Sequence, residues 1–418
     1  MYEPLIFKID FINSNSLDEL NDSNDNLIES DNINLPLISL SFNNFMHRTK
    51  INMNITKKKI NTTSNIYYII NLFEIIIPNY EDSINNLSTI YFNFNNEDQY
   101  IKSRTFYKIW EILFIFNIGD NLDLSTTILS DDNTPIIQSI INYRKKNNIK
   151  IDNDIIYNLS YKNKIPNEII NYYKKNISNI TNDMFDKINY KNKTDLIIID
   201  VNLDWNDDKF QEQENYEFLI KQIITILKIQ NKNGNLIIKI FETFTSLTIK
   251  LIYILTSFYK ENYIYKPFFS KNSDSEKYLI LKYFTYDTKI LNNKIKSLEN
   301  ILNSINNKKY IYDIYSQLSI PIDFINKFKY INSKIANQQQ IIINNYIKYI
   351  KEDNYYGDKY HNYRTLQIEA TKWWIQTFFP PSDNLLKKNK EDINNIINNN
   401  INKNELEIKN FCNLLIYN

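Results

Sequence analysis

Short apolar runs alternate with longer amphipathic stretches through the middle of the chain, from residue 101 to residue 285. Short runs rich in Ile, Leu, Val, Tyr and Phe are typical of strands, whereas apolar residues at helical spacing predict helices. The predicted strands are 124–130, 154–160, 195–201, 234–241, 262–268 and 277–284. The predicted helices are 102–116, 134–147 and 215–232. The last helix is expected to stop at Asn233-Gly234, a pair that commonly ends helices. This alternation predicts an α/β fold with a parallel sheet and right-handed crossovers.

The two ends of the chain have different patterns. Near the N-terminus, a stretch rich in Asn, Asp and Ser at 13–34 predicts a loop or a disordered insert. The apolar segments that predict strands or buried chain there are 38–42 and 66–78. Towards the C-terminus the strand pattern fades, and the predicted helices are 289–307, 324–350 and 363–379. We therefore divide the chain into an N-terminal β-containing region (1–100), an α/β domain (101–285) and a helical extension (286–418) with a low-complexity tail.

Composition narrows the class of protein. The chain has 418 residues and a net charge of +1, which does not indicate a globally basic nucleic-acid binder but allows a local basic groove. One cysteine, Cys412, rules out an intrachain disulfide framework and fits a reducing compartment. Two histidines, His47 and His361, leave little room for a zinc site or a Ser-His-Asp triad. No apolar stretch reaches the ~18 residues of a membrane span, and the first residues lack a signal-peptide pattern. We expect a soluble protein of the cytoplasm or of a virion interior.

Lys239 is the sharpest anomaly in the apolar pattern. It interrupts LIIKIF in a predicted central strand, where a buried ammonium group is costly unless it is paired or deprotonated. Asp200 directly follows the apolar run LIII, and ligand sites of α/β sheets lie at the carboxyl ends of strands. One interpretation is a functional pair at that edge of the sheet. The other is a lysine that reaches solvent from an edge strand, together with a surface aspartate.

Four segments resemble, in order, those of FtsJ-like RNA ribose 2′-O-methyltransferases, including the forms of large cytoplasmic DNA viruses. SRTFYKIWEI places Lys108 where that family has a lysine after an S-R-aromatic pattern. DLIIIDVNLDW matches the strand that delivers the family's aspartate, at Asp200, and GNLIIKIF matches the strand that carries its second lysine, at Lys239. KPFFSKNSDSEKYLILKYF is similar to the last hairpin and places Glu276 at the family's glutamate. The resemblance covers about residues 101–285 and extends more weakly into the helical region.

The resemblance implies a Rossmann-like class I methyltransferase fold with Lys108, Asp200, Lys239 and Glu276 as a catalytic tetrad. It implies that Lys239 is the general base for a ribose 2′-hydroxyl, that Lys108 supplies a nearby cation, and that the two carboxylates orient these groups. The implied cofactor is S-adenosylmethionine, with no metal. The implied substrate is RNA, first of all the cap-proximal nucleotide of mRNA, and the implied partner is a capping or transcription complex.

The methyl-donor loop is where the chain departs from the family pattern A-E-x-P-G-G-F. The residues aligned with this loop are Ser130, Asp131, Asp132, Asn133, Thr134 and Pro135. Thr134 and Pro135 replace both glycines, which would let a donor approach the main chain closely. Asn179 replaces an aspartate near the donor's adenine, and Asn202 replaces a glycine. An active enzyme, a subunit that kept the tetrad but lost donor binding, and an unrelated α/β protein with chance matches stay open as explanations.

Candidate RNA contacts surround the first helix and the last hairpin. The basic side chains expected to meet phosphates are Lys102, Arg104, Lys266 and Lys271. Phe268, Phe269 or Trp205 are candidates to stack on a base, because aromatic stacking suits single-stranded RNA ends. The alternative is a solvated helix face for the first two basic residues and hairpin core for the two phenylalanines. For Trp373 and Trp374, packing against the sheet domain is the expected role.

Overall fold

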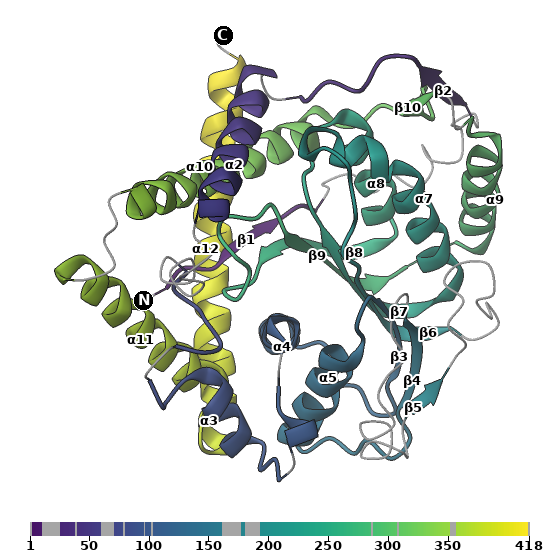
Figure 1. Ribbon diagram of the computed structural model, residues 1–418. Coiled ribbons are helices and arrows are strands. Elements are labelled where there is room, and N and C mark those ends of the chain that lie inside the picture. Colours follow the sequence, from purple (N-terminus) through teal and green to yellow (C-terminus); the bar gives the residue numbers. More distant parts are fainter. Residues whose placement is uncertain are drawn as a thin grey trace.

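The computed structural model describes residues 2–10, 26–37, 40–59, 71–77, 80–95, 97–101, 103–160, 177–179, 193–285, 287–306, 309–351 and 357–416. Among them, the central element is an eight-stranded sheet with the order β1-β8-β9-β7-β6-β3-β4-β5 (Figure 1). Its strands are β1 Leu5–Lys8, β3 Ser125–Ser130, β4 Ile155–Ser160, β5 Ile177–Asn179, β6 Thr194–Asp200, β7 Gln230–Ile240, β8 Tyr259–Lys266 and β9 Lys277–Phe284. In this described part of the chain, no helix is both long and apolar enough to cross a bilayer.

The sheet is mixed rather than wholly parallel. Strands β3 to β7 run parallel, as the strand–helix alternation predicts. By contrast, β9 pairs antiparallel with β7, β8 with β9, and β1 with β8. Only residues 267–276 join β8 to β9, and a connection this short suits antiparallel strands. Because β1 comes from the N-terminal region, the sheet also draws on residues outside 101–285.

Helices cover both faces of the sheet (Figure 1). These helices are α4 Arg104–Phe116, α5 Thr134–Lys146, α7 Gln211–Ile229, α8 Ser246–Thr256 and α9 Thr288–Ser304. Successive strand residues point to opposite faces, so the uninterrupted apolar run of β6 fills two cores. Ile198 packs in the core under α4 and α5, whereas Ile199 packs in the core under α7 and α8. The runs LIII and LIIKI are therefore those of strands buried on both faces.

The junction between α7 and β7 corrects one prediction from the sequence. The helix ends at Ile229 and the strand begins at Gln230, so Asn233-Gly234 lies inside β7 and does not end the helix. The pairing of β7 with β6 is irregular at this point. Gly234 is required by a close approach of two strands, since a Cβ atom there would lie 2.8 Å from the main-chain oxygen of Asp195.

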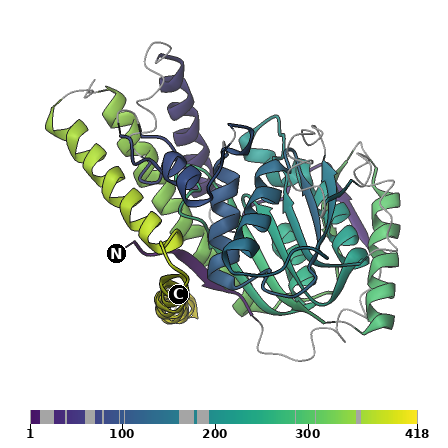
Figure 2. The same ribbon diagram turned by 90° about the horizontal axis from the view of Figure 1, so that it is seen from below.

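Segments from both ends of the chain lie together beside the sheet. Figure 2 shows α10 and α11 on one side of the molecule, with α12 seen end-on below them. α12 contacts β1 and α4, and α2 packs along α10. The remaining elements are β2 Leu27–Ser30, α2 Leu40–Lys59, α3 Ile84–Tyr91, η2 Glu97–Gln99, η3 Asp208–Phe210, β10 Tyr310–Ile314, α10 Ile322–Lys351, α11 Asp358–Phe378 and α12 Asp383–Ile416. The extension is thus built onto the sheet rather than separate from it.

Two further predictions at the ends of the chain are wrong. The apolar segment 38–42 predicts strand or buried chain, but α2 begins at Leu40. A segment this short does not distinguish the strand period from the helix period. The helical extension also contains β10, which pairs antiparallel with β2 from the other end of the chain. Of the apolar segment 66–78, only 71–77 is described. It forms neither helix nor strand, but Phe73 and Ile77 are buried, as the alternative of buried chain predicts.

Candidate active site

The carboxyl ends of β3 and β6 lie side by side where the strand order reverses. From β3 the chain moves outward to β4 and β5, then returns to the other side of β3 as β6. Ser130 ends β3 and pairs in register with Asp200, which ends β6. The Ser130 hydroxyl donates to the Asp200 main-chain oxygen at 3.0 Å. In α/β sheets such a switch point leaves a crevice at the strand ends, which is where ligands bind.

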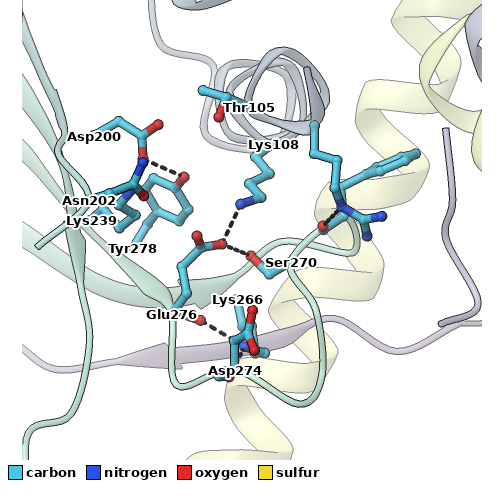
Figure 3. A network of polar contacts seen from close by, with 12 residues as sticks. Thr105, Lys108, Asp200, Asn202, Lys239, Lys266, Ser270, Asp274, Glu276 and Tyr278 are labelled. Atoms are coloured by element: carbon cyan, nitrogen blue, oxygen red, sulfur yellow. Dashed lines mark hydrogen bonds and ion pairs between the residues drawn. The ribbon is translucent and has the colours of Figure 1, made fainter. Parts of the chain in front are cut away.

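Lys108, Asp200, Lys239 and Glu276 meet at this edge of the sheet (Figure 3). Lys108 lies on α4, Asp200 ends β6, Lys239 lies near the end of β7, and Glu276 directly precedes β9. The Nζ atom of Lys239 is 2.9 Å from Oδ1 of Asp200. The Nζ atom of Lys108 is 2.6 Å from Oε1 of Glu276. The structure therefore brings all four predicted residues together as two lysine–carboxylate pairs, which chance motif matches would not do.

The central position of β7 decides between the two interpretations of Lys239. β7 lies between β6 and β9, and the Lys239 side chain is only 2% exposed. It shares the sheet face of Ile237, which α4 covers, because residues two apart on a strand point the same way. Its Nζ atom also donates to Oδ1 of Asn202 at 2.8 Å. The lysine is buried, and its Nζ atom contacts a carboxylate oxygen and an amide oxygen.

Glu276 is ionised at neutral pH because of its lysine neighbours. Burial alone would raise the pKa of its carboxyl group, but the ammonium groups of Lys108 and Lys239 outweigh burial and hold the pKa at about 2. The Ser270 hydroxyl also donates to Oε1 of Glu276, at 2.7 Å. On the other pair, the Tyr278 hydroxyl donates to the Asp200 carboxylate at 3.0 Å. Burial, and then the Asp200 charge, raise the pKa of Tyr278 well above its usual value, so its hydroxyl stays a donor.

The loop predicted to hold the methyl donor directly follows β3. Oδ2 of Asp131 accepts the main-chain N–H of Asn202 at 2.8 Å, which links the ends of β3 and β6. Oδ1 of Asp132 accepts the main-chain N–H of Thr134 at 3.0 Å. Thr134 and Pro135 form the first turn of α5, where the missing N–H of a proline costs no helical hydrogen bond. Side-chain hydrogen bonds thus shape a turn for which the family pattern uses glycines.

Two buried oxygens at this loop suit a ligand. Oδ1 of Asp131 and Oδ1 of Asn133 have no hydrogen-bond partner among the described residues. Buried acceptors are normally satisfied, and these two lie beside a strand-end crevice. S-adenosylmethionine carries hydroxyl donors on its ribose and ammonium donors on its amino-acid end, so these residues fit it chemically. Asn179 ends β5, and the structure describes only its main chain, so its predicted adenine contact stays a prediction.

The basic side chains predicted to meet RNA have other contacts. Arg104 donates to the Glu74 carboxylate and to two main-chain oxygens. Lys266 is buried and donates to two main-chain oxygens of the hairpin, at 2.7 and 2.8 Å. Burial lowers its pKa to about 8. Lys271 lies partly buried with its charge near Glu74, and Lys102 falls outside the described residues. Arg104 and Lys266 serve the chain's own main chain, so their predicted phosphate contacts have no support in the structure.

Of the aromatic residues predicted to stack on a base, two lie in the core and one does not. Phe269 is fully buried, and Phe268 packs against the core that includes Trp374. The ring centroids of Phe268 and Trp373 are 5.1 Å apart. This is the packing role weighed against base stacking for these four residues. Trp205 is only partly buried and lines a cavity of about 50 Å³ together with Lys239.

Ser270, Tyr278 and Glu111 also belong to this site, and the sequence motifs do not predict them. Ser270 and Tyr278 stand inside the hairpin motif that contains Glu276, but only their contacts show what they hold. Glu111 gives a clearer signal in retrospect. It is the one carboxylate in α4, whose residues around it are apolar and buried.

The strand order, the switch point and the convergent charged residues define a Rossmann-like methyltransferase fold. A family model described as FtsJ-like methyltransferase matches residues 153–284. This part of the chain is therefore similar to FtsJ-like methyltransferases.

Curated relatives point to the same family. Cap-specific mRNA (nucleoside-2′-O-)-methyltransferase 1 of Dictyostelium discoideum is 29% identical over 35% of this chain and 19% of its own length. Cap-specific mRNA (nucleoside-2′-O-)-methyltransferase 2 of Drosophila melanogaster is 25% identical over 43% of this chain and 26% of its own length. A protein of African swine fever virus named "Probable methyltransferase EP424R" is 27% identical over 34% of this chain and 38% of its own length. The chain thus spans well under half the length of these relatives.

Proposed function

We propose that this chain is an S-adenosylmethionine-dependent RNA ribose 2′-O-methyltransferase. The observation that carries the proposal is the convergence of the Lys239–Asp200 and Lys108–Glu276 pairs at the carboxyl edge of the sheet. A ribose hydroxyl is a poor nucleophile, so it must lose its proton as it attacks. A buried lysine oriented by a carboxylate can receive that proton when its amine is neutral.

Each residue of the tetrad has a defined task in this proposal. Lys239 takes the proton of the 2′-hydroxyl, which it can do only as a neutral amine. Asp200, held by the Tyr278 hydroxyl, orients the Lys239 Nζ atom. The ionised Glu276 is fixed by Lys108 and helps to orient the lysines and the hydroxyl. In-line positioning of the two reacting groups supplies much of the remaining acceleration.

The methyl donor is expected at the switch point. When bound, S-adenosylmethionine supplies an electrophilic methyl group on a sulfonium centre. Asp131 and Asn133 would hold it through their two unsatisfied buried oxygens. Asp131 also bonds the main chain of Asn202, whose side chain contacts Lys239. The donor loop and the proposed base are therefore connected by one residue.

The substrate we propose is the cap-proximal nucleotide of mRNA. Support comes from two relatives named as cap-specific mRNA methyltransferases and from a relative encoded by African swine fever virus. A capping or transcription complex is the proposed partner. The second candidate function is an RNA-binding or stabilising subunit without donor binding, favoured by Thr134 and Pro135 in place of the loop glycines.

Two measurements on the purified protein test the proposal. Calorimetry should show binding of S-adenosylmethionine and S-adenosylhomocysteine. Transfer of a labelled methyl group should then occur to capped RNA, and should disappear when the first transcribed nucleotide carries a 2′-deoxyribose. Uncapped RNA of the same sequence measures the dependence on the cap. Absence of donor binding, with or without RNA, would overturn the enzyme and leave the non-catalytic subunit.

A further inference from the structure

The hairpin loop, residues 267–276 between β8 and β9, carries Glu276 into the tetrad. Two side chains of α4, those of Glu111 and Arg104, hold the main chain of this loop. Glu111 accepts from one of its N–H groups, and Arg104 donates to one of its carbonyl oxygens. Lys108 lies on the same helix. The separation of Lys108 from Glu276 therefore depends on how the loop is seated on α4.

Glu111 bonds three different elements with its two carboxylate oxygens. Its Oε2 atom accepts the main-chain N–H of Phe268 at 2.8 Å and the hydroxyl of Tyr265 at 3.0 Å. Its Oε1 atom accepts the indole N–H of Trp374 at 2.8 Å. The side chain is fully buried. One carboxylate thus joins its own helix, α4, to β8, the hairpin loop and α11.

The place of Glu111 on α4 relates these contacts to the tetrad. Lys108 and Glu111 are three residues apart, so they are neighbours along one side of the helix. A shift of the loop against α4 would change the contact of Glu111 with Phe268 and the 2.6 Å pair of Lys108 with Glu276 together. Glu111 is buried beneath the loop and acts through the placement of other groups, not through contact with substrate.

We propose that Glu111 is a positioning residue for the Lys108–Glu276 pair and that, through Trp374, it makes α11 part of the active centre. The inference rests on the proposed function, since it concerns the same pair. Both α4 and α11 lie outside residues 153–284, which the family model matches. Segments on either side of the matched residues, α4 before them and α11 after them, therefore complete the site.

Hydrogen-bond chemistry suggests the variant to make. The Phe268 N–H and the Trp374 indole N–H can only donate, and they bond opposite oxygens of Glu111. Glutamine has nearly the same volume but only one oxygen, and its NH₂ group cannot accept. Glu111→Gln therefore leaves one of the two donors unpaired while the packing is preserved.

The experiment compares Glu111→Gln with a matched control, Asp195→Asn. Asp195 also accepts from several donors, on Ser125 and Asn231, but it lies near the amino end of β6, away from the tetrad. Three quantities are measured: kcat, KM for S-adenosylmethionine, and amide hydrogen exchange of the hairpin loop. For Glu111→Gln we expect kcat to fall on the order of 100-fold, as for a small misplacement of reacting groups, with KM nearly unchanged and faster exchange in the loop. The control should lose stability but keep kcat.

Equal kcat in Glu111→Gln and wild type, or equal losses in both variants, would overturn the inference. If Glu111→Gln does not fold, Trp374→Phe tests the contact of Glu111 with α11 alone. This change removes the indole N–H but keeps an aromatic ring. Its expected loss of kcat is up to about tenfold, the effect of one hydrogen bond. Unchanged kcat and unchanged loop exchange in Trp374→Phe would overturn the role of α11.

The two proposals can fail separately. A wild-type protein that transfers no methyl group would defeat the proposed function. In that case loop exchange in Glu111→Gln, set against Asp195→Asn, still decides whether Glu111 seats the hairpin loop. Faster exchange confined to the loop supports the inference, and exchange like that of the control defeats it.

Discussion

The tetrad and the donor loop occupy the same edge of one sheet, yet they differ in how closely their residues match the family pattern. The tetrad consists of charged side chains, and each of the four stands paired with another. In the donor loop Thr134 and Pro135 occupy the positions of both family glycines. Proton transfer needs particular side chains, whereas a loop needs a main-chain path that more than one sequence can produce. Here side-chain hydrogen bonds from Asp131 and Asp132 shape that path.

The contrast between the tetrad and the donor loop is tested most directly at Lys239. We expect Lys239→Met to lower kcat about 10³-fold or more, because the group that takes the proton is removed while the side-chain stem still fills its place. Affinity for S-adenosylmethionine should stay within about threefold, since the donor loop is untouched. Single-turnover methyl transfer to capped RNA and calorimetry with the donor measure the two effects.

The fold of this variant has to be verified alongside. Removing one partner of a buried ion pair leaves the Asp200 charge with fewer partners, so the free energy of unfolding should fall by about 3 kcal/mol. The Tyr278 hydroxyl still bonds Asp200 and limits the loss. Transfer within about tenfold of wild type would remove Lys239 from the role of base.

Asp131 tests the same contrast in the donor loop. Asp131→Ala removes the acceptor that bonds the Asn202 main chain and the buried oxygen available to the donor. We expect the affinity for S-adenosylmethionine to fall about 10- to 100-fold, the effect of a hydrogen bond to a charged group. At saturating donor, kcat should change far less than in Lys239→Met. Calorimetry and donor-titrated initial rates give the two numbers.

The neighbouring aspartate provides the matched control. Asp132 is exposed, and its side chain accepts from the first turn of α5 at 3.0 Å, so Asp132→Ala should weaken donor binding by less than about threefold. Equal losses in Asp131→Ala and Asp132→Ala would mean that the loop acts through its fold and not through the Asp131 carboxylate.

The same contrast explains how much the sequence could predict. The six strands follow from apolar periodicity, and the closeness of Asp200 and Lys239 follows from the rule that parallel strands end at one edge. Lys108 and Glu276 are predicted from the resemblance to FtsJ-like methyltransferases alone. The sequence could not show that Asp131 bonds Asn202, because that contact joins residues 71 apart through the ends of two strands. For the same reason β1, α2 and β10 were missed or misassigned. Their conformation is set by partners far away in the chain.

Arg104 and Lys266 show a different limit. A lysine or arginine near a site predicts a contact with RNA phosphate, but a buried main-chain oxygen is an equally good acceptor. Only coordinates distinguish the two, and both side chains serve the hairpin loop or its neighbours. The sequence marks where basic residues gather and does not reveal which of them are already engaged.

Lys277 allows a test of the pH dependence of stability, the smallest of the expected effects. It is buried next to Glu276, yet it bonds the main-chain oxygen of Phe241. Burial, and then the charge of Lys266, lower its pKa from 10.5 to about 7. Between these values the unfolded chain binds a proton that the folded chain does not, so stability should rise with pH. Relative to Lys277→Met, the wild-type free energy of unfolding should rise by about 1.4 kcal/mol per pH unit from pH 7 to 9. Urea unfolding at pH 6, 7.5 and 9 measures it, with Lys282→Met on the same strand as the control. Parallel stability curves for wild type and Lys277→Met would show that this lysine keeps its proton in the folded protein.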